Sequence, residues 1–136
     1  MKARLTAAVA AVAGVCLFAS PAATSAAPAA APRALSQFLS GDRTVWCVLG
    51  RVPKPSTYCA TMKPVRSVVL GPAGAITVCK GTGCVQNWNP RAPVLRYGQV
   101  NRLYGFRCTS TRAGVTCTVR GKGFRISPRR VTRIIP

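Results

Sequence analysis

Short runs of apolar and β-branched residues, separated by glycine and proline, follow one another from residue 44 to the end of the chain. Apolar and polar positions alternate within these runs, as is typical of half-buried strands, while the three- and four-residue spacing of an amphipathic helix is nearly absent. The pattern predicts strands at Thr44–Leu49, Thr57–Thr61, Ser67–Leu70, Ala75–Cys79, Val100–Cys108, Val115–Val119 and Gly123–Ser127.

Turn signals separate the predicted strands. Pro72-Ala73-Gly74 indicates a turn between two of them, and Thr111–Gly114 indicates the tip of a hairpin. Ser127-Pro128 predicts the start of a short terminal helix, because serine suits the N-cap and proline the first helical position. We therefore expect a small, mostly β, antiparallel domain, either a sandwich or an open barrel, with little helix.

The N-terminal segment has a different pattern. Lys2 and Arg4 precede the uncharged apolar run Leu5–Ala19, and small residues follow through Ala31. This arrangement predicts a cleaved secretory signal peptide rather than a membrane anchor, because a spanning helix needs about 20 apolar residues. The expected organisation is a signal peptide at 1–26, an Ala/Pro-rich spacer at 27–37 and a β domain at 38–136, exported to the exterior or the cell envelope.

Cysteine usage agrees with export. Cys16 would leave with the signal peptide, so six of the seven cysteines remain. An even number in a small exported chain predicts disulfides, and neither the spacing of a zinc site nor a Cys-x-x-Cys redox motif is present. Pairing between neighbours closes the shortest loops, although a crossed pairing stays open. The expected pairs are Cys47–Cys59, Cys79–Cys84 and Cys108–Cys117.

The C-terminal half contains a spaced set of glycines, aromatics and cysteines that resembles a family of small exported actinobacterial proteins to which no function is assigned. The resemblance implies a secreted, disulfide-bonded β domain and carries no catalytic residues. Lys122 stands where that family has histidine. The motifs are Leu95–Gln99, Gly105–Cys108, Gly114–Cys117, Gly121–Phe124 and Ser127.

Charge is the feature of the composition that says most about function. The chain has 20 Lys and Arg, one acidic side chain (Asp42) and no histidine, for a formal net charge of +19. Subtracting Lys2 and Arg4 leaves 18 basic residues and a net charge of +17 for the exported chain. Without histidine or a pair of carboxylates, general acid–base catalysis lacks its usual groups. We therefore expect no enzyme activity, no cofactor, no metal and no small-molecule substrate.

A net positive charge of this size produces an electrostatic field that attracts polyanions. We expect a secreted cationic protein that binds anionic envelope polymers, an anionic membrane surface or nucleic acid. The alternative is a structural or protein-interaction module, such as an inhibitor-like loop at 51–55, with incidental charge. Among the aromatics, Trp88 is the expected exposed candidate, whereas Trp46, Tyr97, Phe106 and Phe124 are expected in the core. The residues expected to bind polyanions are Arg120, Lys122, Arg125, Arg129, Arg130 and Arg133.

Overall fold

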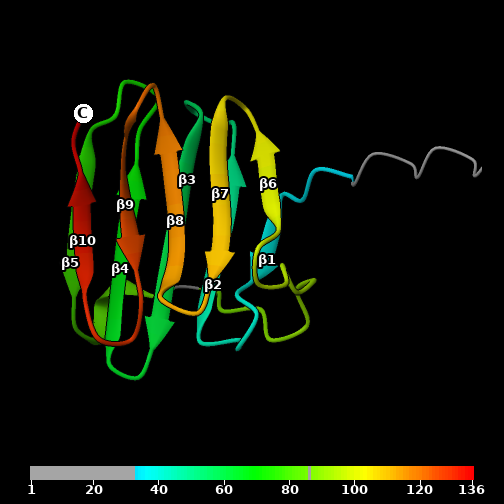
Figure 1. Cartoon of the computed structure of the whole chain (residues 1–136). Helices are drawn as coiled ribbons and strands as arrows, with labels where there is room; N and C mark the ends of the chain where they lie inside the picture. Colours follow the sequence, from blue (N-terminus) through cyan, green and yellow to red (C-terminus); the bar gives the residue numbers. More distant parts are fainter. Residues whose placement is uncertain (1–32, 86) are drawn as a thin grey trace, which may run out of the picture. The chain divides into compact units, whose positions relative to one another are not determined.

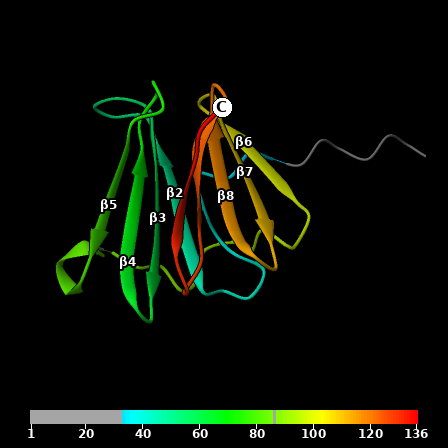
Figure 2. The ribbon, with the colours of Figure 1, turned by 60° about the vertical axis from the view of Figure 1, so that its left-hand side comes forward.

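The computed structural model describes residues 33–85 and 87–136, so the expected signal peptide and most of the expected spacer lie outside the described residues. Ten strands and one 3-10 helix, η1 (Thr82–Cys84), are found there, and the strands form two antiparallel five-stranded sheets (Figure 1). Figure 2 shows the sheets as two layers. The expected fold class is confirmed, and of the two architectures left open the structure has the sandwich.

Each sheet is a meander, in which strands that follow one another along the chain pair side by side. The first sheet contains β1 (Gln37–Leu39), β2 (Val45–Gly50), β3 (Ser56–Met62), β4 (Val65–Leu70) and β5 (Ile76–Lys80). The second sheet contains β6 (Val100–Leu103), β7 (Phe106–Thr111), β8 (Gly114–Val119), β9 (Lys122–Ile126) and β10 (Val131–Ile134).

Three local predictions were wrong. The segment Val100–Cys108 is two strands, because Tyr104 and Gly105 both have positive φ angles (53° and 86°) and turn the chain between β6 and β7. Ser127 caps a turn instead of a helix: its Oγ accepts the backbone N–H groups of Arg129 and Arg130, at 3.3 Å each, and β10 follows. The short strand β1 was missed.

The hydrophobic core lies between the sheets and is built from alternate residues of both. In β9, for example, Phe124 and Ile126 are fully buried while Arg125 between them is exposed. Truncating a core phenylalanine typically lowers the free energy of unfolding by about 3–5 kcal/mol. The main core residues are Phe38, Val45, Leu49, Val68, Leu70, Leu95, Phe106, Val115, Val119, Phe124, Ile126 and four cysteines.

Two disulfides sit at the centre of the sandwich, one in each sheet. Cys47–Cys59 joins β2 to β3, and Cys108–Cys117 joins β7 to β8, each between directly opposite residues. The Sγ atoms of Cys59 and Cys117 are 3.9 Å apart across the core. The third pair, Cys79–Cys84, ties β5 to η1. The structure therefore contains all three of the neighbouring pairs.

Candidate anion-binding cleft

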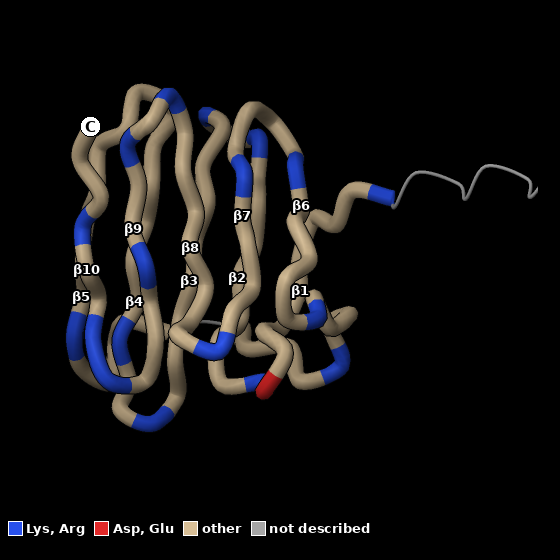
Figure 3. The backbone as a smooth tube through the Cα atoms, viewed as in Figure 1, with Lys and Arg blue, Asp and Glu red and all other residues tan. Residues whose placement is uncertain are grey.

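The six basic residues expected to bind polyanions do not form one cluster. Arg120 precedes β9 in the β8–β9 turn, whereas Arg129 and Arg130 lie in the β9–β10 turn. Successive turns of a meander lie at opposite ends of the sheet, and Figure 3 shows basic residues at both ends of β9. Lys122 packs against Gly74, and Arg125 donates from Nε to Thr116 Oγ1 (3.1 Å) on the exposed face. Closeness in sequence therefore did not give closeness in space.

Three of the six predicted residues converge with two further basic residues at the edge that carries β5 and β10. They line a cavity of about 490 Å³, and Figure 3 shows basic residues gathered along this edge. Val78 and Val131 complete the lining. We call this cavity the cationic cleft. Its basic residues are Arg66 of β4, Lys80 of β5, Arg129 and Arg130 of the β9–β10 turn, and Arg133 of β10.

The cleft follows from the two-residue period of the strands. On β4, β5 and β10, a valine packs in or against the core, and the residue two positions away is basic and on the same side of the strand. Both sheets therefore present cations toward the space between them at this edge. The valine–cation pairs are Val68 with Arg66, Val78 with Lys80, and Val131 with Arg133.

Like charges in the cleft oppose one another. Arg66 and Lys80 are directly paired in the β4–β5 register, an arrangement that destabilises a sheet when the two charges have the same sign. None of the described residues that line the cleft is acidic. Within the described lining, no carboxylate therefore offsets the positive charge.

Arg66 adds an unpaired donor. The residue is half-buried, and its Nε is buried without a hydrogen-bond partner among the described residues. Leaving a buried donor unpaired typically costs about 1–3 kcal/mol, and more for a charged group. An anionic ligand would both accept from this N–H and offset the repulsion between the cations. The two sequence-distant members of the cleft, Arg66 and Lys80, were missed because only the sheet register brings them to β10.

The acidic side chain lies in the β1–β2 turn, outside the lining of the cleft. Asp42 Oδ1 accepts hydrogen bonds from Ser40 Oγ (2.6 Å), Thr44 N (3.1 Å) and Thr44 Oγ1 (2.8 Å). Burial raises the pKa of Asp42, but these bonds outweigh it and hold the pKa below its ordinary value of 3.8. Asp42 instead lines a neighbouring cavity of about 800 Å³, together with Arg112, Arg129 and Arg130.

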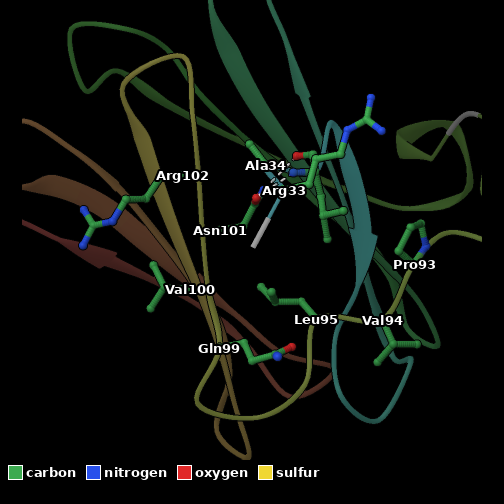
Figure 4. Close-up of a pocket in the computed structure, with 10 residues that line it drawn as sticks. Arg33, Ala34, Pro93, Val94, Leu95, Gln99, Val100, Asn101 and Arg102 are labelled. Atoms are coloured by element: carbon green, nitrogen blue, oxygen red, sulfur yellow. Dashed lines mark hydrogen bonds between the residues drawn. The ribbon is translucent and has the colours of Figure 1, made fainter. Parts of the chain in front are cut away.

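The opposite edge of the sandwich, between β1 and β6, also contains a cavity, of about 710 Å³. It is largely apolar, and Figure 4 shows Leu95 and Val100 beside it while the guanidinium groups of Arg33 and Arg102 extend away. Asn101 closes this edge: its amide donates to Leu35 O and accepts from Leu35 N, each at 2.8 Å. The side-chain amide of Asn101 is thus already paired within the protein.

The other candidate metal-binding and stacking residues have structural roles. Cys47, Cys59 and Cys117 have Sγ atoms within 4.8 Å of one another, but all are in disulfides and offer no thiolate to a metal. Trp88 is half-buried, not exposed as expected, because it packs on Trp46 with ring centroids 5.9 Å apart.

The remaining aromatics divide between core and surface. Phe106 and Phe124 are buried, as expected. Tyr97 was wrongly expected in the core: it is 40 % exposed, with the guanidinium of Arg112 at 5.4 Å from its ring centroid. Tyr104 is similarly exposed beneath Arg51. None of these rings lines the cationic cleft.

No protein-family model, curated protein or solved structure matches the chain. The resemblance to the exported actinobacterial family therefore stays a prediction. Within the part of the chain that the structure describes, no helix is long and apolar enough to cross a membrane.

Proposed function

We propose that this chain is an exported, non-enzymatic binding protein that holds anionic polymers in the cationic cleft. One observation carries the proposal: basic side chains from both sheets converge on a cavity whose described lining has no carboxylate, and Arg66 Nε is buried there without a partner. The candidate ligands are envelope polymers, anionic lipid surfaces and extracellular nucleic acid. All of them present repeated phosphate or carboxylate groups, which Arg binds with charge-assisted hydrogen bonds.

Export is supported by the disulfides and by the N-terminal sequence. Three disulfides in so small a domain are typical of proteins from oxidising compartments. The charged, apolar and small-residue segments of the first 26 residues have the order of a signal peptide. An exported protein with a net charge of +17 would meet the anionic polymers of the envelope directly.

Electrostatic binding has a measurable signature. Each phosphate that a cation neutralises releases condensed counterions, so affinity falls as salt rises. If the basic residues of the cleft all contact a single-chain phosphate polymer, log affinity should fall by about 3.5 for each tenfold increase in salt. The long-range field of the whole protein would add to the rate of association more than to this slope.

The test is fluorescence anisotropy of labelled anionic polymers with the disulfide-bonded exported chain, residues 27–136, over a salt series. We expect binding at low salt that weakens steeply and linearly on logarithmic axes. Neutral polymers of the same length serve as the control. Absence of binding at low salt would contradict the proposal, as would tight binding that ignores salt.

A second candidate function rests on the loop at 51–55. Val52 is 90 % exposed and is flanked by exposed Arg51, Pro53 and Lys54. A rigid loop that presents an apolar side chain between cations suits recognition of a protein partner, because preorganisation lowers the entropy cost of binding. Val52→Ser would abolish capture of such a partner and would leave polymer binding in the cleft unchanged.

A further inference from the structure

We infer that the cationic cleft selects a single chain of phosphate groups that carries no aromatic bases, such as a polyphosphate or a polyol phosphate. This inference rests on the proposed function and narrows its ligand class. Three features of the cleft carry it: its width, its lining and the donor geometry of Arg66.

Width excludes a duplex from the interior of the cleft. Packed sheets are separated by about 10 Å, and Arg66, Lys80 and Arg133 lie on the sides of their strands that face this gap. A B-form duplex, whose major groove alone is about 12 Å wide, could touch only the rim. A single chain of phosphates is narrower and can lie in the cleft at the edge of this gap, where cations from both sheets can reach it.

The lining gives bases nothing to stack on. Proteins that bind single-stranded nucleic acid combine basic grooves with aromatic side chains, each worth about 1–3 kcal/mol per stacked base. Among the described residues, those that line the cationic cleft include valines on its apolar side and no aromatic side chain. The exposed rings, Tyr97 and Tyr104, belong to other parts of the surface and are each covered by an arginine. Recognition in the cleft therefore acts on the phosphates alone.

Three of the basic residues follow one another in a row, which matches the repeated phosphates of a linear ligand. Arg66 and Lys80 oppose each other across β4 and β5, while Arg129, Arg130 and Arg133 follow one another through the β9–β10 turn and along β10. Residues along a strand are spaced by about 3.4 Å each, so Arg130 and Arg133 are up to about 10 Å apart and can meet different phosphates. From the facing sheet, Arg66 Nε supplies one buried donor to the same cleft.

Four probes of equal phosphate number test the inference with the disulfide-bonded exported chain, residues 27–136: inorganic polyphosphate, poly(glycerol phosphate), single-stranded DNA and duplex DNA. Abasic single-stranded DNA serves as the control for bases. We expect the two base-free polymers to bind at least as tightly as single-stranded DNA, removal of the bases to change nothing, and the duplex to bind at least tenfold more weakly. The two base-free probes distinguish a phosphoanhydride chain from a phosphodiester chain.

Arg66→Lys tests the donor without removing charge. We expect affinity for polyphosphate to fall about tenfold, because lysine cannot offer the planar guanidinium donor at the same place. Arg102→Lys, an exposed residue on β6, is the matched control and should change affinity less than twofold. Circular dichroism establishes that both variants are folded, and the polymer series on the unaltered chain tests the inference independently.

The outcomes separate the two proposals. Equal affinity for duplex and single chains, or a clear gain from bases, would overturn this inference and leave polyanion binding in place. An unchanged affinity of folded Arg66→Lys would also overturn it. Failure of every polymer to bind at low salt would overturn both.

Discussion

The two edges of the sandwich differ in what covers their outermost strands. At the β1–β6 edge, other segments of the chain pair with the strands. The backbone N–H of Leu39 donates to Pro93 O, Leu39 O accepts from the N–H of Leu95, and Asn101 pairs with Leu35. At the β5–β10 edge, no such segment pairs with the strands among the described residues, and basic side chains occupy the gap. At the covered edge the Asn101 side chain is paired within the protein, whereas the open edge gathers like charges together with the unpaired Arg66 Nε.

The difference shows which edge is available for a ligand. Inward-pointing charges also protect edge strands from pairing with other chains, so cations alone do not prove a binding site. Edge protection needs charge, but it does not need the Nε of Arg66 to be buried without a partner among the described residues, an arrangement that typically costs stability. Natural proteins tolerate such unfavourable features where function requires them.

The largest effect on stability is expected at the covered edge. Asn101→Ala removes both hydrogen bonds to Leu35 at a position that is 3 % exposed. We expect the free energy of unfolding to fall by about 1–3 kcal/mol, measured by urea denaturation. Polymer binding should not change. The exposed neighbour Arg102→Ala is the control, with a change below about 0.5 kcal/mol.

The open edge should respond in the opposite direction. Arg66→Leu removes the unpaired donor and the repulsion with Lys80 and extends the apolar row of β4. We expect the free energy of unfolding to rise by about 1 kcal/mol, because burying an apolar group avoids the cost of an unsatisfied one. Polymer binding should weaken in the same variant. A clear loss of stability in urea would show that Arg66 is a structural residue.

The smallest effect concerns pH. The pKa of Asp42 lies below its unfolded value, so Asp42 contributes stability above about pH 3.8 that is lost as pH falls through the folded pKa. Asp42→Asn should remove this acid-dependent part and cost less than about 1 kcal/mol at pH 6, because the carboxylate is exposed. Thermal unfolding between pH 2 and 6 measures it. An identical acid profile in the variant would contradict the assignment.

Much of the fold could be predicted because its signals are local. Alternation within short runs and glycine or proline between them identified most strands, and the short loops between cysteines indicated the three pairs. The sheets also repeat one plan, since the disulfide cysteine is the third residue of β2 and β7 and the fourth of β3 and β8. The strand β1 escaped because three residues are too few to show a period.

The cationic cleft could be predicted only in part, because it depends on how the strands pair and the sheets pack, which the local sequence does not show. Arg129, Arg130 and Arg133 were named from their crowding in sequence, but Arg120 and Lys122 belong to the other end of β9. Arg66 and Lys80 had no signal of their own. They join the cleft because β4 pairs with β5 in one particular register and the two sheets pack face to face.

The most direct test compares two triple variants that lower the net charge equally. One is Arg66→Gln, Arg129→Gln and Arg133→Gln in the cationic cleft, and the other is Arg33→Gln, Arg96→Gln and Arg102→Gln near the covered edge. The measurement is the slope of log affinity for polyphosphate against log salt. We predict that the cleft variant loses about two units of slope and the covered-edge variant less than about half a unit. Equal losses in the two variants would contradict a defined site and leave only net charge.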